Sequence, residues 1–200
     1  MRRAGLAVRA ALVVSAAGLS PVVAQSDADL SRQLRGGTFE VGAVLGSAMF
    51  GSKSRLQSCR WNGARFGHRF DGIGGNERIQ LGFRIGIEGC LTEHDEVGRV
   101  DLIHASGSIL FGFRASSSWL VYWTSGVGEL LGDSTPGSGD EVEPRFAWNG
   151  GPGVIWAFSN RFLLDASLMG LVFGNFALGT DPAEGSVFGF IPNLMIALQI

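Results

Sequence analysis

The sequence predicts an all-β fold: a closed, eight-stranded, antiparallel up-and-down transmembrane β-barrel, preceded by a cleavable signal peptide. In residues 79–88, Ile, Leu and Phe at odd positions alternate with Gln, Gly, Arg and Glu at even positions. This is the period of a strand with one apolar and one polar face, and seven further segments repeat it. Charged residues make up only 17% of the chain, with Lys53 the single lysine. A water-exposed domain normally carries more charge, so we expect the apolar faces to meet lipid.

The first 24 residues predict a secretory signal peptide. Two arginines near the start, an apolar run at 10–19 and the small-residue site Val22-Val23-Ala24 fit its pattern. A retained membrane anchor is the alternative, but the apolar run is short. Residues 25–37 are polar and predict a flexible N-terminal tail, so the barrel domain spans 38–200. No later run of about 18 apolar residues follows, and spanning helices are not expected.

The first predicted strands are 39–50 and 64–72, and the second of these has the weaker pattern. Between them, the Ser, Gly and Arg content of residues 51–62 predicts a long loop. Gly74-Gly75-Asn76 predicts a tight turn into the strand at 79–88.

The middle of the chain continues the alternation. Residues 91–98 are rich in acidic groups and predict a loop. Strands are expected at 100–114 and 119–130, joined by a short turn at 115–118. The Gly, Ser, Pro and acidic residues of 132–144 predict another long loop.

The last strands are predicted at 145–158, 162–173 and 187–200. Ser159-Asn160 predicts a short turn between the first two, and residues 174–185 predict a loop before the last.

These segments have the dimensions of a membrane barrel. About 9 to 11 tilted residues cross a bilayer, and short turns alternating with longer loops are typical of outer-membrane barrels. Eight strands enclose a space that side chains just fill, which explains the glycines on the polar face. Pro152 and Pro192 fall inside predicted strands, where each removes a ladder hydrogen bond. We expect a bulge or a rim position at both.

A family resemblance follows from one hairpin. The run from Arg114 to Tyr122, continuing to Ser125-Gly126-Val127-Gly128, resembles the fourth-to-fifth strand hairpin of small OmpA-like outer-membrane β-barrels. The resemblance extends loosely over residues 39–198, and none of its motifs is catalytic. It implies export to the outer membrane of a Gram-negative cell. The implied partners are outer-membrane lipids and lipopolysaccharide, the barrel assembly machinery and periplasmic chaperones. That family usually ends in an aromatic residue, whereas this chain ends in Ile200.

The polar faces predict a filled lumen. Buried charges must be paired, so we expect an ion-pair and hydrogen-bond network with Arg84 near its middle. A gated or selective pore is the alternative, but eight strands leave little room for one. The expected lumen residues are Glu40, Gln80, Arg84, Glu88, His104, Arg114, Arg145, Asn149, Asp165 and Asn193.

Aromatic residues on the apolar faces predict interfacial girdles. Trp148 and Trp156 are eight residues apart on one strand, roughly 20 Å of membrane depth after tilt. The expected girdle residues are Trp119, Trp123, Trp148, Trp156 and Phe158.

The two cysteines, Cys59 and Cys90, fall in the first long loop and at the end of the third strand. In an exported protein we expect them to form a disulfide, which would add roughly 3 to 4 kcal/mol of stability. Two free thiols are the alternative.

Two short motifs contain residue types that can carry chemistry. His104 and Ser106 share one strand face and could serve as the base and nucleophile of a barrel lipid A deacylase. Such enzymes present the pair to lipid, whereas Ile103 and Ala105 occupy the apolar face here, so no enzymatic activity is expected. His94-Asp95-Glu96 could ligate a divalent ion, but a solvated acidic turn is the favoured interpretation. No metal or cofactor is expected.

The sequence therefore predicts an integral outer-membrane barrel with a largely filled lumen. Its role would be structural or surface recognition through extracellular loops, as a monomer. A net charge of −2 gives no electrostatic footprint for nucleic acid. The alternative is a secreted lipocalin-like barrel with its apolar faces inward, but the polar face carries Gly and Ser rather than the Lys and Glu of a water-facing surface.

Overall fold

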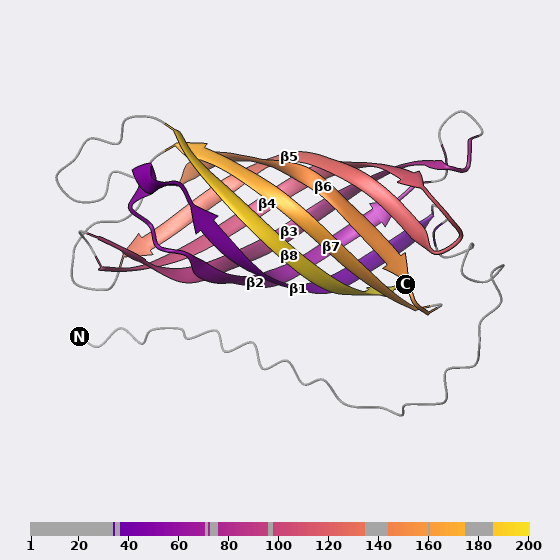
Figure 1. Ribbon diagram of the computed structural model, residues 1–200, viewed down its shortest axis with the longest axis horizontal. Coiled ribbons are helices and arrows are strands. Elements are labelled where there is room, and N and C mark those ends of the chain that lie inside the picture. The colour runs from indigo at the N-terminus through magenta and orange to yellow at the C-terminus, as the bar shows by residue number, and fades with distance from the viewer. Residues whose placement is uncertain are drawn as a thin grey trace, which may run out of the picture.

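A computed structural model describes residues 34, 37–70, 72, 76–95, 98–134, 144–159, 161–174 and 186–200. In these residues eight strands form a closed antiparallel barrel, in which each strand pairs with its sequence neighbours and the last pairs with the first. Figure 1 shows the strands winding obliquely around the long axis. The strands are β1 (Thr38–Phe50), β2 (Cys59–Arg69), β3 (Ile79–His94), β4 (Gly98–Arg114), β5 (Trp119–Ser134), β6 (Arg145–Ala157), β7 (Phe162–Gly174) and β8 (Ser186–Gln199), and a 3-10 turn, η1 (Ser52–Ser54), follows β1.

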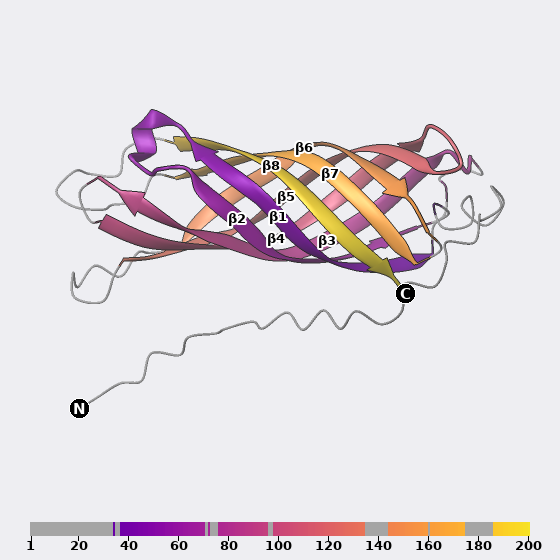
Figure 2. The same cartoon turned by 60° about the horizontal axis from the view of Figure 1, so that its bottom comes forward.

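The strand register gives the barrel its stagger. Following the paired residues once around the barrel from Glu40 leads back to β1 at Phe50, ten residues further along. A barrel can close only with such a stagger, which tilts its strands by about 35 to 45° from the axis. The tilt is visible in both views (Figures 1 and 2).

The two ends of the barrel differ. η1 lies at one end and the C-terminus at the other in both views (Figures 1 and 2). We call these the loop end and the turn end. At the turn end, connections join β2 to β3, β4 to β5 and β6 to β7; at the loop end they join β1 to β2, β3 to β4, β5 to β6 and β7 to β8. The short turn at 115–118 is as predicted. Four residues separate β6 from β7 around the turn predicted at Ser159-Asn160, of which Asn160 lies outside the described residues, as does most of the turn predicted at Gly74–Asn76.

Two predicted loops are wrong in extent. β2 already begins at Cys59, inside the predicted loop 51–62. The acidic loop predicted at 91–98 is strand at both of its ends, because β3 runs to His94 and β4 starts at Gly98, with residues 96 and 97 outside the described part of the chain. The physical reason is that Thr92 and His94 keep the inward alternation while Glu93 faces out. Past the apolar belt an outward carboxylate meets water, so acidic residues do not end a strand there.

The outer wall is apolar, as predicted. Leu45 and Ile87 are each 66% exposed, and every strand except β2 carries exposed large apolar residues of this orientation. On β2, Phe66 faces outward and is half-buried. The lipocalin alternative required these faces to point inward, and the structure shows the opposite orientation. Among the described residues, no helix has the length and apolar character to span a membrane.

The inner wall is less polar than the sequence indicated. Leucine, isoleucine and phenylalanine fill the lumen toward both ends. The buried inward set includes Leu102, Leu110, Leu120, Leu130, Ile155, Leu163, Leu171, Phe173 and Ile191. Leu34, in the predicted flexible tail, is also fully buried and belongs to this core.

Neither Pro152 nor Pro192 occupies a bulge or a rim. Both lie mid-strand and face outward, with the register unchanged on either side. Pro152 pairs with Trp123 of β5 but has no pair in the β6–β7 ladder. Pro192 pairs with β7 and has none in the β1–β8 ladder. The missing proline N–H therefore interrupts one ladder at each site without shifting a strand.

Candidate functional site

The centre of the lumen is organised around the guanidinium of Arg84 on β3. Its Nη2 lies 2.8 Å from Glu40 Oε1 and 2.6 Å from Asp165 Oδ2, and its Nη1 donates a hydrogen bond to the Tyr122 hydroxyl at 3.0 Å. Tyr122 in turn donates to Asp165 Oδ1 at 2.5 Å. All four residues are buried. Arg84 thereby ties together β1, β3, β5 and β7 from inside the barrel.

A second polar cluster lies toward the loop end, around Glu88. Trp61 Nε1 donates to Glu88 Oε2 at 2.6 Å, and Arg65 makes a two-point ion pair with the same carboxylate. Arg65 Nη1 also donates to Asn193 Oδ1 at 3.2 Å, which accepts a further bond from Ser167 at 2.8 Å. Two-point arginine–carboxylate pairs combine charge with fixed geometry, so this cluster holds β2, β3, β7 and β8 in register.

The charges of the two clusters cancel. Arg69 lies 3.5 Å from the second oxygen of Glu40. Three arginines (Arg65, Arg69, Arg84) therefore face three carboxylates (Glu40, Glu88, Asp165). A buried charge is tolerated only with such a partner, and a neutral set offers no net field to draw ions through the barrel.

One glycine makes room for this arrangement. Gly153 of β6 is paired with Tyr122 of β5. A Cβ at Gly153 would lie 2.2 Å from Tyr122 Cζ, so the phenol ring can lie flat across the strand only because Gly153 has no side chain. The ring then reaches Asp165 and also stacks beneath Arg84, whose Cζ is 4.8 Å from the ring centroid.

A small polar cavity separates the two clusters. Its volume is about 20 Å³, enough for about one water molecule. Its hydroxyl and amide lining comes from Ser106, Ser108, Thr124, Asn149 and Ser167. Nothing among the described residues opens it into a continuous channel, because apolar side chains pack beyond it toward each end.

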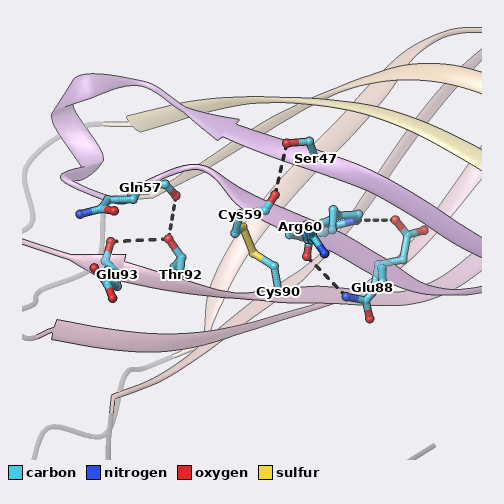
Figure 3. Close-up of a disulfide and its surroundings, with 10 residues drawn as sticks. Ser47, Gln57, Cys59, Arg60, Glu88, Cys90, Thr92 and Glu93 are labelled. Carbon is cyan, nitrogen blue, oxygen red and sulfur yellow. Dashed lines mark hydrogen bonds between the residues drawn. A yellow bond between two sulfur atoms is a disulfide. The ribbon is translucent and has the colours of Figure 1, made fainter. Parts of the chain in front are cut away.

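The disulfide fastens the first loop at the loop end. Cys59 and Cys90 are bonded (Figure 3), beyond the last β2–β3 pair at Asn62 and Gly89. Outside it, Gln57 N–H donates to Glu93 O at 2.9 Å, and Thr92 Oγ1 donates to Gln57 O at 2.7 Å. The segment before β2 therefore runs alongside the end of β3 and is hydrogen-bonded to it (Figure 3).

The structure joins some of the predicted lumen residues and separates others. Glu40, Arg84, Asp165, Glu88 and Asn193 belong to the two clusters. Three residues lie elsewhere. Arg114 pairs with Glu77 at the turn end, Arg145 lies at the loop end at the start of β6, and Gln80 is buried outside the two clusters. His104 is buried beside the second cluster, as the cross-strand partner of Glu88, with its ring centroid 6.3 Å from that of Trp61. Asn149 lines the cavity.

Five residues of the two clusters are not among the predicted lumen residues: Trp61, Arg65, Arg69, Tyr122 and Ser167. Trp61 was assigned to a loop, so its alternation was not used. Arg65, Arg69 and Tyr122 are all in phase with the polar face of their strands, and that phase was the signal that could have identified them.

The aromatic residues form a girdle mainly at the turn end. Trp119 and Trp156 stack with centroids 5.8 Å apart, and Phe158 and Phe162 continue the row. Trp148 lies toward the loop end and donates to Ser125 Oγ at 3.3 Å. Trp123 is mid-wall, opposite Pro152, and belongs to the apolar belt rather than to a girdle.

A second aromatic row was not predicted. Phe39, Phe66, His68 and Phe70 stack along the turn ends of β1 and β2, with the Phe39 and His68 rings 4.2 Å apart.

The candidate chemical motifs are not assembled into a site. His104 is buried and faces the lumen, as does Ser106. In the described part of the chain, no group of three or more His, Cys, Asp or Glu side chains could hold a metal ion. His94 is buried and Asp95 exposed, while Glu96 lies outside the described residues.

No family model matches the sequence, and no curated protein sequence matches it either. The fold is nevertheless similar to several solved structures. Neisserial surface protein A has a TM-score of 0.54 at 12% identity, over 80% of this chain and 95% of that one. Ail, the attachment invasion locus protein of Yersinia pestis, has 0.52 at 14%, over 82% and 97%. The outer membrane protein OprG from Pseudomonas aeruginosa has 0.51 at 10%, over 83% and 97%. At such identities the likeness establishes the barrel fold.

Proposed function

We propose that this chain is an integral outer-membrane protein of a Gram-negative bacterium, with a closed lumen and a structural or surface-recognition role carried by its loop end. The observation that carries the proposal is the belt of exposed large apolar side chains around a barrel whose lumen holds the buried ion pairs of Arg65 and Arg84. Exposed apolar area of this extent is incompatible with water and matches the lipid face of a transmembrane barrel. The similarity to solved outer-membrane barrels supports it.

The proposal includes a route and an orientation. Residues 1–24 act as the signal peptide, and periplasmic chaperones and the barrel assembly machinery insert the exported chain. The short connections at the turn end face the periplasm, and the loop end faces the exterior, because outer-membrane barrels have short periplasmic turns and longer external loops. The barrel works as a monomer among outer-membrane lipids and lipopolysaccharide.

Membrane insertion is tested by expressing the full chain in a Gram-negative host. We expect the protein in the outer-membrane fraction, resistant to alkaline carbonate, and shifted in gel mobility by boiling because a closed barrel survives detergent at room temperature. Recovery in the soluble periplasmic fraction would contradict the proposal and favour a secreted ligand-binding barrel.

The closed lumen is tested by electrical recording. Because the cavity holds about one water, the purified protein should give no discrete conductance steps in planar bilayers. A porin inserted under the same conditions is the control. Reproducible single-channel steps would instead identify a small pore.

The absence of enzymatic activity belongs to the same proposal. His104 and Ser106 face the lumen, where a lipid acyl chain cannot reach them. Overexpression should therefore leave the acylation pattern of lipid A unchanged by mass spectrometry. Loss of one acyl chain, abolished by Ser106→Ala, would identify a lipid A deacylase.

A further inference from the structure

The outer wall carries an apolar groove across β1 to β4, with a volume of about 410 Å³. Its floor is made by two small side chains, Ala64 and Ala105, which are the cross-strand partners of Ile87 on either side. Larger residues stand around them. The groove is lined by Val41, Ala64, Phe66, Ile85, Ile87 and Ala105. A volume of this size is that of a ligand site rather than of a packing defect.

Polar side chains interrupt the apolar belt directly beyond the groove, toward the loop end. From Ala64 toward the loop end, the next outward-facing residues of β2 are Asn62 and then Arg60, and both are exposed. Ser47 of β1 is the cross-strand partner of Arg60. We call these three residues the polar notch. Arg60 is four residues from Ala64, about 13 Å along the strand at about 3.3 Å per residue.

Arg60 is exposed and can meet an anionic ligand. Among the described residues, no carboxylate forms an ion pair with its guanidinium, whereas the exposed Arg99 lies 3.7 Å from Asp101. An arginine on the lipid face costs about 2 to 4 kcal/mol at the bilayer midplane and about 0 to 1 kcal/mol near the interface. Arg60 therefore belongs at the headgroup level, where its long side chain can reach a phosphate.

We infer that the groove and the polar notch together bind one molecule of lipopolysaccharide. The inference rests on the proposed function, which places the loop end in the outer leaflet. Along β2 the wall presents a guanidinium, then a carboxamide, then an apolar floor. Lipid A presents a phosphate, then sugar hydroxyls and acyl amides, then acyl chains, in the same order of depth.

Each group of the site then has a partner. Arg60 pairs with a phosphate, Asn62 and Ser47 form hydrogen bonds to the sugar or acyl-amide groups, and one acyl chain lies against Ala64. Glu129, the cross-strand partner of Ala105, borders the groove on the side away from Arg60. Closer to the loop end, the exposed Asp101 is the cross-strand partner of Leu91 and lies 3.7 Å from Arg99. A glycerophospholipid would satisfy Arg60 and the groove but lacks the amide and sugar groups that match Asn62.

The test measures lipid that stays with the full-length barrel. Wild type and variants are purified from outer membranes in mild detergent, and lipopolysaccharide per barrel is counted by native mass spectrometry. Arg60→Gln removes the phosphate contact, and Ala64→Phe fills the groove. The matched controls are Arg99→Gln, also exposed at the loop end, and Ala166→Phe, an exposed alanine on the far wall in β7. We expect at least a fivefold loss of bound lipopolysaccharide in the first two variants and none in the controls.

Each other outcome overturns the inference. Equal retention in all five proteins means that the site does not bind the lipid. Phospholipid retained at the site in place of lipopolysaccharide, or a dimer broken by Ala64→Phe, means that another occupant covers the groove. Gel mobility before and after boiling shows that each variant is folded, and Ala64→Leu replaces Ala64→Phe if the latter does not assemble. Failure of the proposed function gives a different result, since no protein would then reach the outer membrane.

Discussion

Individual residues in the lumen act by joining strands that are far apart in sequence. Arg84 contacts carboxylates from β1 and β7 and a hydroxyl from β5. A buried ion pair is much more stable than the same charge buried without its partner, but it need not stabilise the fold more than apolar residues would. The clusters around Arg84 and Glu88 therefore specify one closed arrangement more than they add stability to it.

Arg84→Met tests this dependence. The substitution leaves Tyr122 in place but removes the shared cation from Glu40 and Asp165, so two carboxylates lose a buried partner. We expect a loss of about 3 to 5 kcal/mol in the free energy of unfolding, measured by urea titration in lipid vesicles with tryptophan fluorescence. Arg99→Met is the control. Its exposed pair with Asp101 contributes less than about 1 kcal/mol. Equal losses of unfolding free energy in both variants would show that the fold does not depend on the Arg84 cluster.

Gly153→Ala tests how closely Tyr122 is packed. The new methyl would overlap the phenol ring, which is held by Asp165 and Arg84 and cannot turn away freely. Overpacking of this kind costs about 1 to 3 kcal/mol. Gly107→Ala is the control, because its Cβ would meet nothing within 4 Å. An unchanged unfolding midpoint for Gly153→Ala would mean that the ring can shift without losing its hydrogen bonds.

Alternation in the sequence was enough to place these residues inside. It assigned Glu40, Arg84 and Asp165 to the inner face, since side-chain direction along a strand depends only on parity. It could not say that these three meet, because that depends on the stagger between strands. Hence Arg114 was predicted in the network although its partner is Glu77 at the turn end.

At the scale of the elements, the strands extend further than composition indicated. β3 continues through Leu91, Thr92 and Glu93 to His94, and β4 begins only four residues later. Local composition marked this region as a loop, but pairing between the two strands persists to His94 and Gly98. The disulfide and the segment before β2 lie along this extension, and both stabilise the loop end of β3.

Reduction of Cys59–Cys90 tests the contribution of that edge. The bond closes a separation of 31 residues, for which chain entropy accounts for about 3 to 4 kcal/mol. We expect a reducing agent to lower the urea midpoint of the wild type. The Cys59→Ser/Cys90→Ser double variant should start at the lower midpoint and not respond to the reducing agent. A midpoint in the wild type that is insensitive to complete reduction would contradict this assignment.

At the scale of the whole molecule, the barrel resembles a soluble fold turned inside out. Four of its five tryptophans are exposed, and its buried ion pairs are at the centre. The cost of an outward charge should therefore depend on its depth in the wall. No soluble barrel of the same shape would show this dependence.

Leu194→Arg and Leu198→Arg test it within one strand. Both leucines face outward on β8, the first near mid-strand and the second next to the turn end. In vesicles, we expect Leu194→Arg to cost about 2 to 4 kcal/mol and Leu198→Arg about 0 to 1 kcal/mol, from urea unfolding monitored by fluorescence. Equal costs at the two positions would argue that the outer wall does not lie in a bilayer.

The sequence by itself determined the strand number, the face that each residue occupies and the apolar outer wall, because these follow from parity and from the length of each alternating segment. Only the tertiary structure decided which charges pair, where Tyr122 lies and how the groove forms on the outer wall. Those features depend on the ten-residue stagger, which a single strand does not encode. The closure of all eight strands sets this stagger. The resulting register places Arg84 beside Asp165 and Ala64 beside Ile87.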